Sequence, residues 1–149
     1  MNELRATYRT YLLVDNFLAD KENRARSKSS RDMWSQRRAL NDQAHFGLLF
    51  AKLEARINRL CSMLIVRKQK LSRWRQRRWW SSIEIKKLDR IWFLNRADML
   101  LDRSSHHRAN LEALYEIRCK IVHGGTLATP INVPTMAQTI FAIAAQLRK

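Results

Sequence analysis

Residues 42–66 read DQAHFGLLFAKLEARINRLCSMLIV and carry the clearest structural signal in the chain. Their large apolar side chains recur at steps of three and four residues, the spacing of one face of an α-helix. The stripe comprises Phe46, Leu49, Phe50, Leu53, Ile57, Leu60 and Leu64. This stretch therefore predicts a long amphipathic helix that packs against a core, with Asn41 or Asp42 as its N-cap.

The same spacing recurs on both sides of this helix. It predicts further helices from Leu4 to Leu18, from Ser81 to Leu100, from His106 to His123, and from a Thr135 cap to Leu147. The chain has only 3 glycines and 2 prolines, whereas strand-and-turn folds use these residues often. We therefore expect one all-α domain over residues 1–149, an antiparallel bundle of four to five helices connected in part by the basic segments 21–38 and 67–80.

The charge of the chain is strongly unbalanced. Its 29 lysines and arginines face 13 aspartates and glutamates, which gives a formal net charge of +16. Because such an excess repels itself in a compact fold, it indicates a polyanionic partner. Nucleic acid is the leading candidate, and an anionic membrane surface or a merely soluble basic surface are the alternatives.

Neither a secretory signal nor a membrane span is visible in the sequence. The N-terminus MNELRATYRT is polar and charged, unlike the apolar centre of a signal peptide. No apolar run approaches the roughly 20 residues that cross a bilayer. The two cysteines, Cys61 and Cys119, lie within apolar helical patterns and fit reduced thiols better than a disulfide. We expect a cytoplasmic protein without a membrane partner, and no His/Cys/carboxylate spacing indicates a metal or other cofactor.

The helix expected over residues 106–123 ends in RCKIVH, followed by two glycines that would close it. Arg118 falls on the apolar stripe of this helix, and an arginine there is costly unless it is paired or faces another subunit. The stripe comprises Leu111, Leu114, Ile121 and Val122. Taken singly, Arg118 could extend its charged head to solvent or pair with a neighbouring carboxylate such as Glu54. His123 could simply favour the helix dipole.

Together the two residues suit the cleavage of RNA by its own 2′-hydroxyl. A neutral imidazole such as that of His123 can take the hydroxyl proton or deliver one to the leaving oxygen. The guanidinium of Arg118 can hold the scissile phosphate at two points and stabilise its added charge. One histidine rarely serves as both base and acid, so the pattern indicates a second copy of the chain across a twofold axis.

A family resemblance rests on the same stretch. YEIRCKIVHG, residues 115–124, resembles the Arg-x4-6-His signature of HEPN-domain ribonucleases, which closes a long helix just before a glycine. NDQAHFGLLF, residues 41–50, resembles the helix that begins many HEPN toxins. Glu54, residues 77–79 and the helix end at residues 99–102 follow in the family's order.

The resemblance covers roughly residues 40–125 and implies an all-helical homodimer whose two motifs meet in one cleft and cut RNA without metal. It implies that Arg118 and His123 are catalytic, with Cys119 and Glu54 in supporting positions. Many family members are toxins or phage-defence effectors, so it also implies a cognate antitoxin protein. Two positions depart from the family: Cys119, a weak hydrogen bonder, replaces the usual Asn, Asp or His, and Gly125 replaces a tyrosine that some members have modified.

The most basic stretch of the chain, residues 67–80, interleaves cations with tryptophans. Cations neutralise phosphates and flat rings stack on unpaired bases, the combination that single-stranded RNA binding uses. The alternatives are that the tryptophans pack beneath a loop, or that the segment docks an acidic antitoxin. The candidate RNA-binding residues are Arg67, Lys68, Lys70, Arg73, Trp74, Arg75, Arg77 and Arg78.

The sequence thus favours a metal-independent endoribonuclease and leaves two alternatives open. One is a non-catalytic HEPN module that binds RNA or a protein partner, with Cys119 marking a degraded site. The other is an unrelated basic helical protein that binds nucleic acid or a membrane surface.

Overall fold

The computed structural model describes residues 1–125, 127 and 129–147, and it confirms the all-α prediction. Every regular element in this part of the chain is a helix. The elements are α1 (Asn2–Asn23), α2 (Lys28–Gln69), α3 (Trp74–Ser81), the 3-10 helix η1 (Ile85–Arg90), α4 (Phe93–Ala97), α5 (His106–Val122) and α6 (Val133–Gln146).

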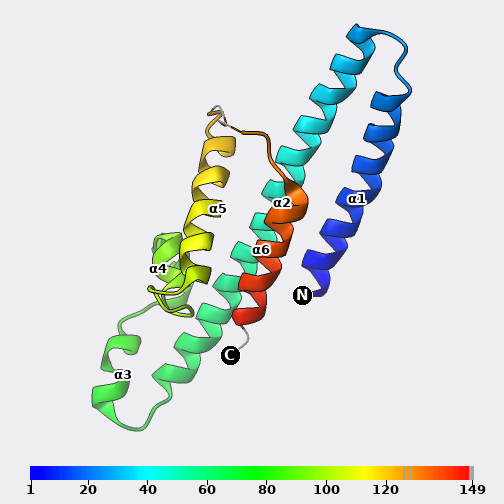
Figure 1. The fold of residues 1–149 in the computed structure, drawn as a ribbon. Coiled ribbons are helices and arrows are strands. Elements are labelled where there is room, and N and C mark those ends of the chain that lie inside the picture. Colours follow the sequence, from blue (N-terminus) through cyan, green and yellow to red (C-terminus); the bar gives the residue numbers. More distant parts are fainter. Residues whose placement is uncertain (126, 128, 148–149) are drawn as a thin grey trace.

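The long helix α2 is the element against which the others pack (Figure 1). α1 lies antiparallel beside the first part of α2, and the tip of this hairpin projects beyond the rest of the bundle. α5 and α6 pack on each other and on the middle of α2, while α3, η1 and α4 lie at its other end. The fold is therefore a bundle of four long helices with a short-helix region at one end.

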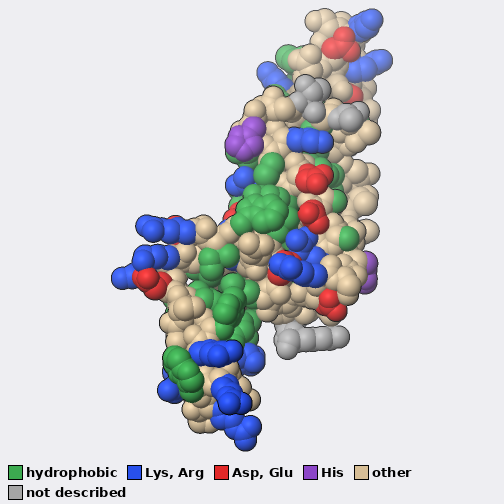
Figure 2. All heavy atoms as spheres, turned by 90° about the vertical axis from the view of Figure 1, so that its left-hand side faces the viewer, with side chains coloured by type: hydrophobic (Ala, Val, Ile, Leu, Met, Phe, Trp, Pro, Cys, Tyr) green, Lys and Arg blue, Asp and Glu red, His purple; other side chains and the backbone are tan. Residues whose placement is uncertain are grey.

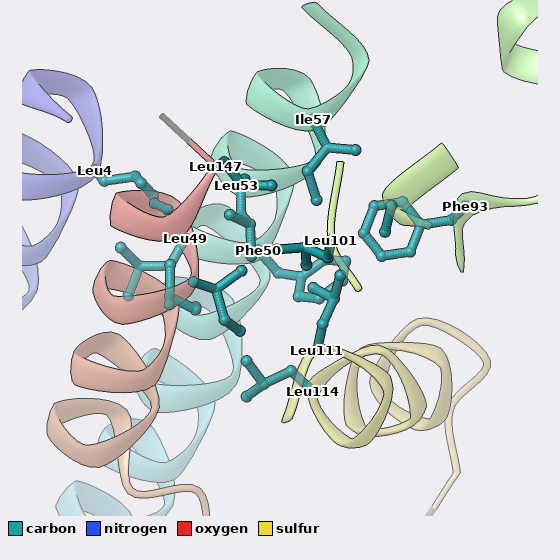
Figure 3. Packing of buried hydrophobic residues seen from close by; sticks show 14 of the residues in the cluster. Leu4, Leu49, Phe50, Leu53, Ile57, Phe93, Leu101, Leu111, Leu114 and Leu147 are labelled. Carbon is teal, nitrogen blue, oxygen red and sulfur yellow. The ribbon is translucent and has the colours of Figure 1, made fainter. Parts of the chain in front are cut away.

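The predicted stripe of α2 forms the centre of the core. Phe46, Leu49, Phe50, Leu53 and Ile57 have no exposed surface. Figure 3 shows the core side chains of α1, α2, α4, α5 and α6 pointing toward one another around Phe50 and Leu53. Past Ile57 the buried face continues through Cys61 and Ile65, so the predicted Leu60 and Leu64 are only partly covered.

α2 begins earlier than the sequence pattern predicts. Its N-cap is Ser27, whose hydroxyl oxygen accepts a hydrogen bond from the Ser30 amide at 3.1 Å, and not Asn41 or Asp42. Most of the expected connecting segment 21–38 is consequently helical. The reason is tertiary: this basic stretch has α1 beside it, and Arg38 donates from Nε to Asp15 at 2.6 Å.

The helix predicted from Ser81 to Leu100 is instead two short elements, η1 and α4. Between them, Ile91 has an extended backbone conformation and Trp92 a non-helical one. The physical reason is the spacing of the apolar residues, because Leu88 and Phe93 are buried but lie five residues apart, which one helix cannot present on the same face.

Two smaller expectations for the last helices are also corrected. α6 is capped by Asn132, whose side-chain oxygen accepts from the Thr135 amide at 3.0 Å, so Thr135 lies inside the first turn. Val122 is exposed, while Ile121 is partly covered.

In the described part of the chain, no helix combines the length and apolar character needed to cross a membrane.

Candidate functional site

The end of α5 has the form that the sequence predicts. Ser105 caps the start of the helix by accepting from the Arg108 amide at 3.2 Å. At the other end Gly124 has a positive φ of 69°, a conformation that glycine adopts without strain. The Gly125 amide donates to the Lys120 carbonyl at 2.8 Å and closes the last turn. His123 is the C-cap residue, and its side chain is exposed.

Arg118 is half-buried, one turn after the buried Leu114. No hydrogen bond, ion pair or ring contact joins its side chain to any residue that the structure describes. Arg38, Arg96 and Arg108 also have restricted exposure and pair with Asp15, Glu54 and Asp98, respectively. The half-buried Arg77 has no carboxylate partner among the described residues but donates to the Leu71 carbonyl and lies over the Trp74 ring. With no counter-charge among the described residues, the Arg118 guanidinium is available to bind an anion from outside the chain.

Glu54 does not neutralise Arg118, so the pairing alternative for these two residues is wrong. Its carboxylate lies 3.3 Å from the Arg96 guanidinium, and Arg96 also donates to the Asn58 side chain at 2.5 Å. The Arg96 side chain is only 7% exposed. Glu54 therefore compensates a buried charge at the α2–α4 contact, which is a structural role.

The two cysteines are free, as predicted, and occupy different environments. Cys119 is half-buried next to Arg118 in the sequence. Cys61 is fully buried and donates to the Arg96 carbonyl at 3.1 Å. Burial raises the pKa of Cys61 to about 11, although the nearby Arg96 charge acts in the opposite direction. Cys61 is therefore an uncharged core thiol at neutral pH.

The basic, tryptophan-containing segment is divided between two helices. Arg67 and Lys68 lie in the last turn of α2, with Lys70 as its C-cap, and Arg73 is the N-cap of α3. On α3, Trp74 is 60% exposed, and Arg75 and Arg78 are exposed. Arg77 is half-buried; it donates to the Leu71 carbonyl at 3.4 Å and lies over the Trp74 ring.

α3 therefore presents an aromatic and cationic surface to solvent. The sequence has no aspartate or glutamate between residues 55 and 83, and among the described residues no carboxylate forms an ion pair with an arginine of α3. Figure 2 shows lysine, arginine and hydrophobic side chains together on the end of the molecule that α3 forms. This distribution suits a polyanion that also offers flat apolar groups.

The two parts of the candidate site lie apart within one copy of the chain. α3 is at one end of the bundle, whereas His123 is at the far end of α5 (Figure 1). The 17 residues of α5 correspond to a helix of about 25 Å. One bound strand would have to extend along α5 to contact both surfaces of the same copy.

Sequence reasoning missed a buried ion-pair cluster at the start of α5. Arg108 is 9% exposed and donates from Nε to Asp98 at 2.5 Å. Burial alone would lower the pKa of Arg108, but its bonds to Asp98 and Glu112 leave that pKa raised. A signal was available, because Arg108 lies three residues before Leu111 on the same apolar stripe that drew attention to Arg118.

Comparison of the chain with protein-family models, with curated proteins and with solved structures gave no match. Over its described residues, the chain is a basic all-α bundle with an unpaired arginine and an exposed histidine at one helix end. The described residues contain no group of three or more His, Cys, Asp or Glu side chains that could hold a metal ion.

Proposed function

We propose that this protein is a metal-independent endoribonuclease in which the Arg118 and His123 residues of two copies form one composite site. The observation that carries the proposal is the state of Arg118, which is half-buried and unpaired among the described residues while Arg38, Arg96 and Arg108 have carboxylate partners. A phosphate of RNA would supply the missing counter-charge and accept two parallel hydrogen bonds from the guanidinium.

The chemistry follows from these two side chains. The imidazole of one His123 takes the proton of a ribose 2′-hydroxyl, and the 2′-oxygen forms a bond to the adjacent phosphorus. The bond to the 5′-oxygen of the next nucleotide breaks, and the imidazolium of the second copy delivers a proton to that oxygen. Arg118 stabilises the negative charge that accumulates on the phosphate oxygens. The products are a 2′,3′-cyclic phosphate and a 5′-hydroxyl.

The biological setting rests on the resemblance of residues 115–124 and 41–50 to HEPN ribonucleases. By that resemblance, the enzyme is the toxin of a toxin–antitoxin pair or an effector of phage defence, and a cognate antitoxin protein restrains it. The net charge of +16 supports a polyanionic substrate of this kind.

Cleavage of single-stranded RNA by the purified protein in the presence of EDTA tests the proposal. We expect undiminished cleavage with EDTA and products that end in a 2′,3′-cyclic phosphate, because proton transfer and charge stabilisation come from protein side chains. Mapping the product ends by mass spectrometry provides the measurement. Cleavage that stops on metal removal, or products ending in a 3′-hydroxyl and a 5′-phosphate, would contradict it.

A second candidate function is the binding of single-stranded RNA without cleavage. The location of α3 favours it, because the exposed cations and Trp74 lie at the opposite end of α5 from His123. The same assay separates the two functions. Binding that weakens steeply with salt, without any cut product, would favour the second candidate.

A further inference from the structure

A pocket of about 590 Å³ opens between α3 and the segment that contains α4. The apolar wall of the pocket consists of Trp79, Trp80, Ile83, Ile91 and Met99. The Trp79 and Trp80 rings meet edge to face, with centroids 5.0 Å apart and planes at 88°. Because Trp79 is 59% exposed, most of its surface is open to a ligand.

The backbone beneath this wall is fixed to the end of α2. The Gln69 side-chain amide donates to the Trp80 carbonyl at 2.9 Å and to the Ile83 carbonyl at 3.0 Å. This side chain bridges the two ends of the turn that carries the pocket wall. The backbone that carries the aromatic residues is therefore held in place before a ligand binds, which lowers the entropy cost of binding.

The other lining residues, Asn95, Asp98 and Arg103, are polar. Both carboxylate oxygens of Asp98 are occupied, one by Arg108 at 2.5 Å and the other by Arg103 Nε at 2.7 Å. Arg103 is exposed, and its two terminal nitrogens have no partner in the described chain. The exposed Asn95 amide is also without a hydrogen-bond partner among the described residues. The polar lining thus offers a two-pronged cation and an amide that has both a donor and an acceptor group.

These features match one nucleotide of an unpaired strand. An aromatic wall stacks on the face of any base, and an asparagine amide pairs with the donor and acceptor edge of a base. A guanidinium fork binds the phosphate that accompanies the base. The absence of acidic residues between 55 and 83 adds charge complementarity to the same end of the molecule.

We propose that this pocket binds one unpaired nucleobase of a single-stranded RNA, with Trp79 stacking on the base, Asn95 pairing with its edge and Arg103 holding an adjacent phosphate. The RNA as ligand rests on the proposed function. The pocket lies at the end of α5 opposite His123, so it acts as a grip on the substrate and not as part of the cutting site.

Binding of a fluorescent single-stranded 2′-O-methyl RNA to the wild type and to Trp79→Ala tests the proposal. This probe has no free 2′-hydroxyl and cannot be cut, so the assay measures binding alone. An error in the proposed pocket would appear in this binding assay, whereas an error in the proposed cleavage mechanism would appear only in the cleavage assay. We expect Trp79→Ala to weaken binding by about tenfold, Asn95→Ala to weaken it less, and Trp79→Phe to restore most of it. The slope of log Kd against log salt should not change, because no cation is removed.

Two controls identify the cause of any loss of RNA binding. Trp92 is 55% exposed but lies outside the pocket, so Trp92→Ala should bind like the wild type. A sugar-phosphate strand without bases should bind Trp79→Ala and the wild type equally. The proposal is overturned if Trp79→Ala binds the base-bearing strand as tightly as the wild type. It is equally overturned if the wild type binds the base-bearing strand no more tightly than the strand without bases. That result is expected of a pocket that binds a protein partner.

Discussion

Replacing His123 by alanine is expected to lower the rate of RNA cleavage by about a hundredfold or more, because the site loses its general base and acid. Arg118→Ala is expected to cause a loss of about the same size, because the phosphate loses its two-pronged hydrogen-bond donor in the transition state, where its negative charge is greatest. His123 is exposed at the end of α5, so its removal should leave the fold intact. Initial rates on a single-stranded RNA, with thermal unfolding measured in parallel, provide the test.

The same turn of α5 offers a matched control. Lys120 is an exposed cation between the two proposed catalytic residues, and Lys120→Ala should retain cleavage within a few-fold of the wild type. Arg118→Lys should retain only part of the activity, because an ammonium group cannot make the bidentate contact. Equal losses in Lys120→Ala and Arg118→Ala would show that charge alone matters and would contradict the assigned role of Arg118.

Glu54→Ala is expected to destabilise the fold by about 3 kcal/mol. Its removal leaves the Arg96 guanidinium, whose side chain is 7% exposed, with the Asn58 side chain as its one polar side-chain partner among the described residues. Chemical denaturation of the purified variant measures this change. Because Glu54 acts through Arg96 and not through Arg118, the folded variant should still cleave RNA at nearly the wild-type rate.

An exposed ion pair provides the comparison for Glu54. Glu84 lies 2.7 Å from Lys87, and both side chains are about half exposed, so Glu84→Ala should change the free energy of unfolding by about 0.5 kcal/mol or less. Replacing both members of the pair, as in Glu54→Ala with Arg96→Met, should recover part of the lost stability. A Glu54→Ala cost no larger than that of Glu84→Ala would contradict the structural role.

The sequence predicts the long helices well because their apolar periodicity is strong. The stripe from Phe46 to Ile57 and the glycine-closed end of the helix at His123 both appear as expected. These are local signals: periodicity reports which face is buried, and a glycine reports where a helix stops. The proposed catalytic pair lies on such an element, so its positions could be assigned from the sequence.

Features that depend on partners from distant elements could not be assigned. Glu54 contacts Arg96, 42 residues away, and no periodicity indicates which arginine a carboxylate will meet. Residues 28–38 read as a basic connection because their pattern is polar, yet α1 beside them makes the helix favourable. The pocket beside Trp79 is likewise built from several elements, and only the fold brings Asn95 and Arg103 to it.

The central claim is that the end of α5 supplies half of an RNA-cleaving site. Mixed dimers formed by subunit exchange between the wild type and the doubly inactive Arg118→Ala, His123→Ala protein test this claim most directly. If each active site needs the Arg118–His123 pair of both copies, only dimers of two wild-type copies cut RNA. An equal mixture of the two proteins should then retain about a quarter of the wild-type activity. Retention of about half the activity, as expected when each copy carries a complete site, would contradict it.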